Sequence, residues 1–261
     1  MVQNLCCNRL DNVRRAGVSM SGLAVITGGG RGIGAATTRR LAADGYRLII
    51  TYNTDSQSAE TVIAEIREQG CDCVAAKVDC GNASEVMVLA DHPWVKEGVD
   101  ALVLNHAVYE RSRASSLTSE QLARTMSVNF AGAFLVWEAL NPYLNDDARI
   151  VVVGSQMGFK GTPTGADYSA SKGALHAWAR SLSLDVAERG QRVNVVAPGT
   201  INTDLVSGDS PTKRRAREED IPMGRLGHPD EVAGVISFLL GPDSGYMTGS
   251  VVHVNGGLYR P

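Results

Sequence analysis

Seven short apolar runs alternate with helix-length segments along almost the whole chain, and this alternation restricts the fold more than any other feature. The apolar runs lie at 23–27, 47–52, 73–78, 101–105, 149–154, 192–197 and 250–254. Helical patterns fill the gaps at 32–44, 56–69, 83–97, 118–140, 165–189 and 229–241. Continuously apolar strands are typical of a parallel sheet covered on both faces, and repeated strand–helix–strand units imply right-handed crossovers. We therefore predict an α/β fold, a doubly wound parallel sheet of about seven strands with helices on both faces.

The chain is expected to fold as one domain. Its 261 residues would fit one large or two small domains, but no internal repeat, low-complexity tract or linker divides it. We assign residues 20–261 to this single domain. Residues 1–19 form an N-terminal extension with charges but no apolar signal core, and the sequence leaves open whether it is ordered.

The least regular part of the domain is 199–228. Glycines and prolines interrupt it at Gly199, Gly208, Pro211, Pro222, Gly224 and Gly227. An irregular stretch of this length in a compact domain is usually functional or disordered, and we predict a lid over the substrate. The charge run at 213–220 inside it is expected to form a solvated helix face.

Composition excludes several classes of function. A net charge of −3 gives no general attraction to nucleic acid or to an anionic membrane. The longest apolar runs, such as 150–153, are far shorter than the ~20 residues of a membrane helix. No cysteine pair has the spacing of a zinc site, and we predict no metal. Free thiols in a reducing, cytoplasmic compartment are the simplest account of the five cysteines Cys6, Cys7, Cys71, Cys73 and Cys80.

A glycine-rich turn, TGGGRGIG at 27–34, follows the first apolar run and precedes a helix. Glycines permit a tight turn and a close backbone approach, and the helix N-terminus offers free N–H groups to a pyrophosphate. No Gly-Lys-Ser/Thr closes the stretch, which excludes a P-loop. The context predicts a Rossmann-like dinucleotide site whose candidate residues here are Gly28, Gly30, Arg31, Gly32, Ile33 and Gly34.

The end of the second apolar run bears on the choice of dinucleotide. NAD binders usually carry an acidic residue there, but this chain reads Thr51-Tyr52-Asn53-Thr54 and has no carboxylate before Asp55. Arg31 lies in the glycine turn, where it could meet a 2′-phosphate. We favour NADP(H), with Asn53 among the contacts, and NAD(H) stays possible because a loop arginine can be only structural.

The segment YSASK at 168–172 places Tyr168 and Lys172 one helical turn apart on one face. A phenol beside an ammonium is a candidate proton donor, although alone the pair could be an ordinary surface feature. Ser155 lies thirteen residues upstream of Tyr168, directly after the run 149–154.

The TGxxxGxG and Tyr-x-x-x-Lys motifs together resemble those of the short-chain dehydrogenase/reductase family, from about Leu23 to the C-terminus. The closest resemblance is to bacterial 3-oxoacyl-reductase-like members, through 221–233 and the C-terminal VVHVNGGLYR. Further matching positions, in order, are Asp79, Asn105, Ala107, Asn129, Ser155, Pro198, Gly199 and Thr203.

The resemblance implies an oxidoreductase that moves a hydride between a nicotinamide and a ketone or secondary alcohol. Tyr168 would be the general acid and base, with its pKa lowered by Lys172, which would also hold the nicotinamide ribose. Ser155 would stabilise the substrate oxygen, and Asn129 would hold a water in a relay to Lys172, or be a helix-kinking core residue. The implied cofactor contacts also include Asp79, Asn105, Ala107, Pro198, Gly199 and Thr203.

Two departures from the family pattern follow Asn105. His106 replaces the usual second asparagine and is expected to be a packing residue, and Val108 replaces a glycine and would reshape the cleft entrance. Specificity would be set by residues flanking the catalytic serine, namely Tyr109, Gln156, Met157, Phe159 and Thr162.

The acidic stretches 145–147 and 184–185 lie where a carrier-protein reductase needs a basic docking surface. We therefore expect a small free ketone or alcohol as substrate. The alternatives are an NAD-dependent alcohol, polyol or steroid dehydrogenase and, without turnover, a dinucleotide-binding sensor. Trp137 and Trp178 lie in the helices through which relatives pair, so we predict a homotetramer.

Overall fold

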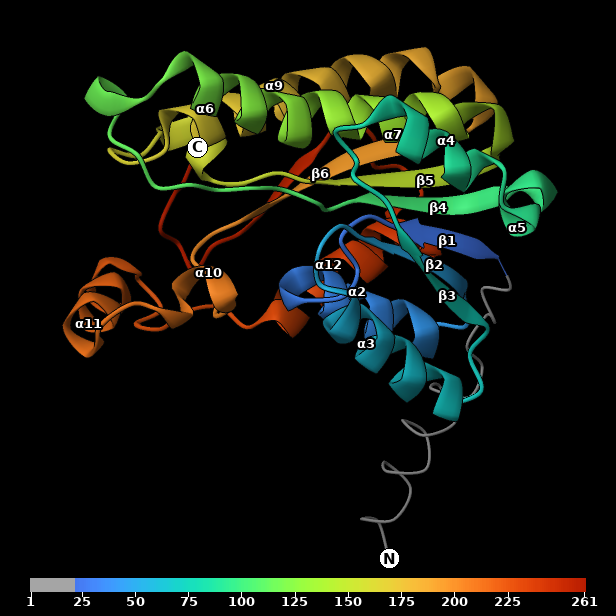
Figure 1. Cartoon of the computed structure of the whole chain (residues 1–261), viewed down its shortest axis with the longest axis horizontal. Coiled ribbons are helices and arrows are strands. Elements are labelled where there is room, and N and C mark those ends of the chain that lie inside the picture. Colours follow the sequence, from blue (N-terminus) through green and yellow to red (C-terminus); the bar gives the residue numbers. More distant parts are fainter. Residues whose placement is uncertain (1–21) are drawn as a thin grey trace, which may run out of the picture.

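All seven strands form one parallel sheet in the order β3-β2-β1-β4-β5-β6-β7 (Figure 1). The computed structural model describes residues 22–261, and the predicted extension 1–19 lies outside them. The strands are β1 (Leu23–Ile26), β2 (Arg47–Tyr52), β3 (Cys73–Lys77), β4 (Val99–Leu104), β5 (Leu144–Val153), β6 (Arg192–Pro198) and β7 (Val251–Val254). The predicted doubly wound α/β fold is confirmed.

The strands are apolar throughout because both faces of the sheet are covered. Side chains of a strand alternate between its faces. Leu23 and Val25 of β1 therefore join one core cluster, and Ala24 and Ile26 join a second on the other side. All four are fully buried.

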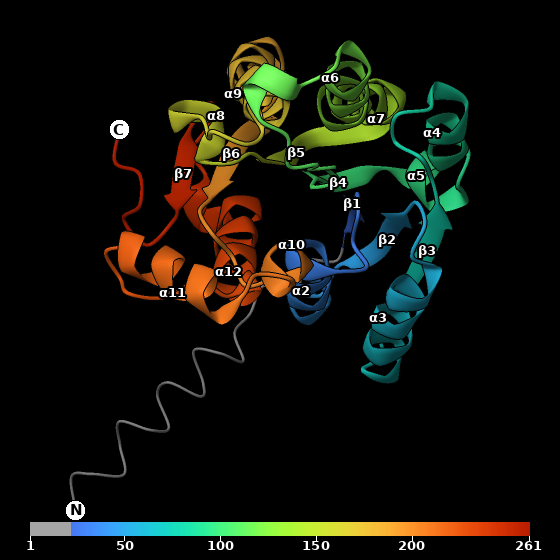
Figure 2. The ribbon, with the colours of Figure 1, turned by 60° about the vertical axis from the view of Figure 1, so that its left-hand side comes forward.

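Helices form a layer on each face of the sheet (Figures 1 and 2). On one face lie α2 (Gly32–Ala43), α3 (Ser56–Glu68) and α12 (Pro229–Leu240). On the other lie α4 (Ala83–Ala90), α5 (Pro93–Glu97), α6 (Ser119–Met126), α7 (Gly132–Leu140), α8 (Met157–Lys160) and α9 (Ala166–Asp185). Among residues 22–261, no helix has the length and apolar character that a membrane span requires.

Two predicted helices are interrupted. The segment 83–97 splits into α4 and α5, since the ring of Pro93 cannot continue a helix. The segment 118–140 contains one π-helical turn, η2 (Ser127–Ala131), between α6 and α7. Such turns often accompany functional sites, and this one contains Asn129.

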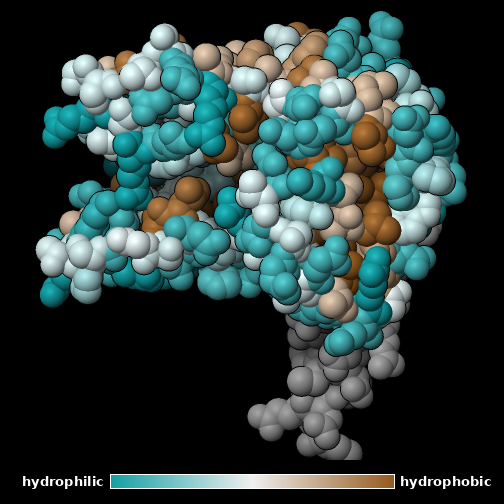
Figure 3. All heavy atoms as spheres, viewed as in Figure 1, coloured by the Kyte–Doolittle hydropathy of each residue, from teal (hydrophilic) through white to brown (hydrophobic). Residues whose placement is uncertain are grey.

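The stretch 199–228, called the lid segment below, is more helical than its glycines and prolines suggest. It contains α10 (Asp204–Ser207) and α11 (Pro211–Asp220). None of the α11 residues is buried, as expected for a charge run on a solvated helix. The two helices project to one side of the sheet (Figure 1), and a hollow with apolar residues in it opens between them and the α6 end of the molecule (Figure 3).

The position of this hollow follows from the topology. The chain runs from β1 to β2 and β3 in one direction and returns through β4 to β7 in the other. Open α/β sheets bind ligands at the carboxyl ends of the strands where this reversal occurs. Thr203, which precedes α10, lies next to Gly32 at the start of α2, so the lid segment begins at this edge.

Candidate active site

The glycine turn after β1 has the conformation that its residues predict. Gly28 and Gly32 have φ values of 65° and 52°, which side chains rarely tolerate. A Cβ on Gly34 would collide with the carbonyl oxygen of Gly28. The turn therefore closes tightly because Gly28, Gly32 and Gly34 lack side chains.

The N-terminus of α2 is open to an anion. Arg31, its N-cap residue, makes no side-chain capping bond within the described part of the chain, and the first turn contains no acidic residue. Open N–H groups and the positive end of the helix dipole suit a pyrophosphate. A dinucleotide therefore fits this turn through the backbone of Gly32, Ile33 and Gly34.

Gly30 lies where the turn packs on α3. A Cβ at Gly30 would lie 2.9 Å from the Cα of Ala59, on that helix. Its missing side chain therefore allows this packing, and a contact of its backbone with the cofactor stays a prediction.

Arg31 and Asn53 are both exposed beside the turn. The nearest carboxylate, Asp55, caps α3 and accepts from the N–H and hydroxyl of Ser58 at 3.0 and 2.7 Å. These hydrogen bonds, with a smaller contribution from Arg31, lower the pKa of Asp55. This carboxylate is therefore occupied in capping, and a guanidinium lies near it.

Side chains after β3 and β4 hold the edge of the cradle together. Asn105 donates to the carbonyl oxygens of Thr27 and Gly28, both at 3.0 Å. His106 bonds Thr27 Oγ1 at 2.8 Å and Val128 O at 3.0 Å, as expected for a packing residue. Asp79 accepts from the N–H of Gly81 at 2.9 Å.

Ala107 is exposed at the end of β4. Burial, with Lys172 contributing, lowers the pKa of His106 to about 4, so the ring is neutral at physiological pH. The loop after β4 therefore presents no extra charge to the cleft from this histidine.

Asn129 holds this same loop in place. Its amide donates to Val108 O at 2.9 Å and to Ser171 Oγ at 3.1 Å, while Oδ1 accepts from Val108 N at 2.7 Å. Both of its N–H bonds are thus made to groups other than Lys172. The structure places the Asn129 side chain as a buried brace for the loop at 108, and the water that Asn129 would hold in a relay to Lys172 stays a prediction.

Tyr168 and Ser155 meet at the carboxyl edge of β5. Burial raises the pKa of the Tyr168 phenol to about 12, against the opposing effect of a hydrogen bond with Ser155. Ser155 is 7% exposed, and its Oγ accepts from the N–H of Met157 at 3.1 Å. The pKa of the Tyr168 phenol in the chain alone therefore lies above its usual value and not below it as expected, because burial has the largest effect.

Lys172 is buried beneath this pair. Its Nζ donates to Val153 O at 2.7 Å and lies 5.6 Å from the centroid of the Tyr168 ring. Burial lowers the pKa of Lys172 to about 8, so the group still carries most of its charge at neutral pH. The Lys172 ammonium makes one hydrogen bond within the described part of the chain, so its other N–H groups can donate to polar groups of a ligand.

The opposite wall comes from β6 and the lid segment. Pro198 O accepts from the N–H of Gln156 at 3.0 Å, and Gly199 N–H donates to Val254 O at 2.9 Å. Thr203 lies against the glycine turn.

Arg111, beyond β4, reaches across to the lid segment. It donates to Leu205 O at 3.0 Å and to Asp209 at 3.2 Å. Asp209 also pairs with Lys213 and Arg217. The loop after β4 and the lid segment are therefore tied together at the mouth of the site.

The predicted substrate residues separate into two groups. Tyr109 is half-buried, with its ring centroid 4.6 Å from that of Tyr168 and its hydroxyl donating to Thr164 O at 2.6 Å. Met157 is also half-buried. Gln156 is 2% exposed, so it is more deeply buried than these two residues, and its contact with the substrate stays a prediction.

Sequence reasoning missed His176, whose Nε2 accepts from the N–H of Ser155 at 3.3 Å. It lies one further helical turn beyond Lys172, so Tyr168, Lys172 and His176 share one helix face. The i, i+4, i+8 spacing is the signal that could have identified it.

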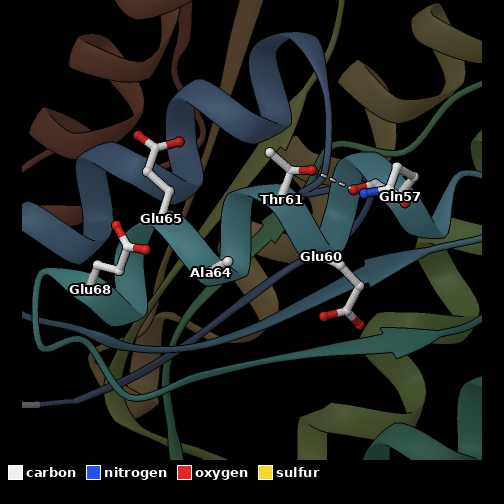
Figure 4. Close-up of a pocket in the computed structure, with 6 residues that line it drawn as sticks. All are labelled: Gln57, Glu60, Thr61, Ala64, Glu65 and Glu68. Carbon is white, nitrogen blue, oxygen red and sulfur yellow. Dashed lines mark hydrogen bonds between the residues drawn. The ribbon is translucent and has the colours of Figure 1, made fainter.

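A shallow depression on the outer side of α3 is separate from this site (Figure 4). Thr61 donates to Gln57 O at 2.8 Å, and Glu65 pairs with Arg39 of α2 at 2.8 Å. All of its walls belong to one helix, with the residues Gln57, Glu60, Thr61, Ala64, Glu65 and Glu68.

Comparisons with known proteins identify the family of the chain. A family model described as enoyl-(acyl carrier protein) reductase matches residues 28–259. An uncharacterised oxidoreductase of Methylorubrum extorquens is 34% identical over 240 residues, covering 90% of this chain and 97% of the relative. A 3-oxoacyl-(acyl-carrier-protein) reductase of Synechocystis sp. is 33% identical over 240 residues, covering 90% and 96%.

A solved structure of a short-chain dehydrogenase from Burkholderia cenocepacia, in complex with NADP, is 32% identical. It superposes with a TM-score of 0.87 over 92% of this chain and 99% of that chain. The similarity thus extends over the whole sheet and both layers of helices. With the family model covering residues 28–259, it shows that the chain belongs to the short-chain dehydrogenase/reductase family of oxidoreductases.

Proposed function

We propose that the chain is an NADPH-dependent reductase of ketones that runs in reverse on the matching secondary alcohols. The observation that carries the proposal is the meeting of a phenol, a hydroxyl and a buried ammonium, from Tyr168, Ser155 and Lys172, beside an open helix N-terminus. A proton donor and an oxygen stabiliser are what carbonyl reduction requires from the protein.

The phenol of Tyr168 is the proposed proton donor to a carbonyl oxygen that gains negative charge. Burial raises its pKa to about 12 in the chain alone, which weakens it as an acid, so proton transfer requires a nearby positive charge that favours the phenolate. Ser155 Oγ accepts from the N–H of Met157, so its own hydrogen can donate, to Tyr168 in the chain alone and to the carbonyl oxygen when substrate is bound. Lys172 contributes a positive charge that stabilises the phenolate left behind.

NADP(H) is the proposed cofactor, and when bound it supplies the hydride. The Burkholderia relative holds NADP. Arg31 is exposed beside the glycine turn, and Asp55 is occupied by Ser58 and so does not replace a ribose-binding carboxylate. An NAD-dependent alcohol, polyol or steroid dehydrogenase is the alternative within the enzyme class.

A small free ketone is the proposed substrate. Tyr109 lies against Tyr168 and narrows the space above the phenol. Asp146, Asp147 and Asp185 are exposed in the acidic stretches. They would repel an acidic carrier protein.

We propose a homotetramer that pairs through α7 and α9. Four aromatic side chains form one cluster there, with the rings of Trp137 and Trp178 at 6.1 Å. Phe134 is 37% exposed and contacts both. A tetrameric mass by light scattering at micromolar concentration is expected, and a monomeric mass would contradict the pairing.

A cytoplasmic location is also proposed, supported by the free thiols of Cys71, Cys73 and Cys80.

The test follows NADPH and NADH absorbance in parallel with free ketones, diketones and 3-oxoacyl thioesters. Faster turnover of a free ketone with NADPH supports the proposal, while a preference for NADH favours the alternative dehydrogenase. If no carbonyl is reduced although NADPH binds, the dinucleotide-binding sensor becomes the better account.

A further inference from the structure

The C-terminal tail, residues 255–261, is held close to the lid segment. Asn255 fixes its turn by accepting from Gly257 N–H at 3.0 Å and donating to Tyr259 O at 2.8 Å. Gly256 has a φ of 62°, and a Cβ there would lie 2.7 Å from Ile221. Leu258 then packs on the lid cluster of Val206, Ile221 and Leu226.

The next residue, Tyr259, faces the loop that carries the candidate catalytic serine. Its ring stacks on Phe159 of α8 with centroids 5.5 Å apart and planes inclined by 19°. Figure 2 shows the tail running from the α11 side of the molecule towards α8. One short segment thus contacts the lid segment through Leu258 and the serine loop, residues 154–160, through Tyr259.

Phe159 transmits this contact to a buried histidine. Its ring also stacks on His176, at 4.4 Å and 22°. His176 is 1% exposed and accepts the N–H of Ser155 through Nε2 at 3.3 Å. Accepting at Nε2 requires the neutral ring with its proton on Nδ1.

Packing holds the orientation of the His176 ring. Its Nδ1 is buried and finds no hydrogen-bond partner within residues 22–261. A second hydrogen bond usually fixes the orientation of a functional histidine. Here the Phe159 ring performs that task together with the backbone of Gly154 and Gly158, where an added Cβ would collide with the His176 ring.

We propose that Tyr259 is a positioning residue that sets Ser155 through Phe159 and His176. The inference rests on the proposed function, because it assumes that Ser155 stabilises the substrate oxygen. A displacement near 1 Å at a catalytic group can lower rates by ~10²-fold, and loss of one stacking ring should cause a smaller shift. We expect Tyr259→Ala to lower kcat about tenfold while the NADPH Kd is unchanged.

Matched variants separate positioning from general destabilisation. Tyr259→Phe keeps the ring and should retain wild-type kcat. Tyr246→Ala removes a fully exposed tyrosine elsewhere and should also have no effect. Equal losses in Tyr259→Ala and Tyr259→Phe would overturn the proposal, since only the hydroxyl would then matter.

A double-mutant cycle tests whether the effect passes through the serine. In a Ser155→Ala background, Tyr259→Ala should cause no further loss of kcat. A tenfold loss that persists there would overturn the proposal.

Hydrogen exchange at the Ser155 amide, without substrate, tests the link independently of turnover. Exchange should rise about tenfold in Tyr259→Ala and stay unchanged in Tyr259→Phe. Unchanged exchange in Tyr259→Ala would overturn the link. If exchange rises as expected but Ser155→Ala retains full activity, Ser155 does not stabilise the substrate oxygen. The proposed effect of Tyr259 on catalysis is then overturned, while the packing link from Tyr259 to the Ser155 amide is retained.

Discussion

The glycine turn at 27–34 and the serine side of the cleft, which carries Ser155, Tyr168 and Lys172, differ in the atoms that form them. The turn is defined by backbone: positive φ at Gly28 and Gly32, a missing side chain at Gly34 and open N–H groups. The serine side is defined by buried side chains from several elements. Within the described part of the chain, buried polar atoms without a hydrogen-bond partner occur there on Gln156, Asp167, Ser169 and His176.

This difference predicts how each side responds to mutation. A cradle made of backbone tolerates changes of side chain around it but not added atoms within it. A site made of buried polar side chains has chemical groups whose removal abolishes activity with little loss of stability, because burying those groups is itself unfavourable.

The largest expected effect on cofactor binding is at the cradle. Gly34→Ala introduces a Cβ that collides with the Gly28 carbonyl, so the turn must open. We expect the NADPH Kd, measured by fluorescence titration, to rise more than about 100-fold. Gly234→Ala, in open space on α12, is the matched control and should bind normally. Tight binding by Gly34→Ala would break the backbone account of the cradle.

The second prediction concerns Lys172→Met on the serine side. Activity should fall about 100-fold through loss of the cation. A shift of the Lys172 pKa from 10.5 to about 8 corresponds to about 3 kcal/mol of burial penalty, which the methionine variant regains. The variant loses a similar ~1–3 kcal/mol because Val153 O is left without a hydrogen-bond donor. Thermal unfolding should therefore move by less than about 4 °C. A large loss of stability together with activity would show that Lys172 is mainly structural.

The third prediction concerns the preference for NADPH over NADH. Arg31→Ala should raise the KM for NADPH about tenfold, at the low end for a hydrogen bond to a charged group at an exposed site, and leave that for NADH unchanged. Arg215→Ala removes an exposed arginine from α11 and serves as control. Equal losses with both cofactors would show that Arg31 does not read a 2′-phosphate.

The smallest expected effect is a change in folding stability at acidic pH. The pKa values of His106 and His176 are both lowered, mainly by burial, to about 4 from 6.5. The unfolded chain therefore binds more protons between these values, and stability falls as the pH decreases from 6.5 to 4. Denaturant unfolding of His176→Leu should show a shallower fall over that range than wild type. An identical fall would mean that His176 does not titrate on unfolding.

Much of the fold could be predicted from the sequence because it depends on local pattern. Every predicted strand is present, since apolar runs of five or six residues report burial on both faces. The conformation of the glycine turn was equally predictable, because adjacent residues determine it. The π-turn that contains Asn129 was not, and the hydrogen bonds of this side chain to the Val108 backbone join elements that are separate in the sequence.

The serine side could be predicted only in part. Motif positions identified Tyr168, Ser155 and Lys172, but not the state of the phenol, whose pKa depends on how deeply the fold buries it. The stack of His176, Phe159 and Tyr259 joins three distant segments. Contacts of this kind follow from tertiary packing and leave no spacing in the sequence.

Tyr168→Phe tests the central claim most directly, because it removes one oxygen and keeps the ring. NADPH should bind as in wild type, while kcat/KM for the best ketone of the panel should fall about 10³-fold. Turnover within tenfold of wild type, with cofactor binding intact, would contradict the assignment of Tyr168 as the proton donor.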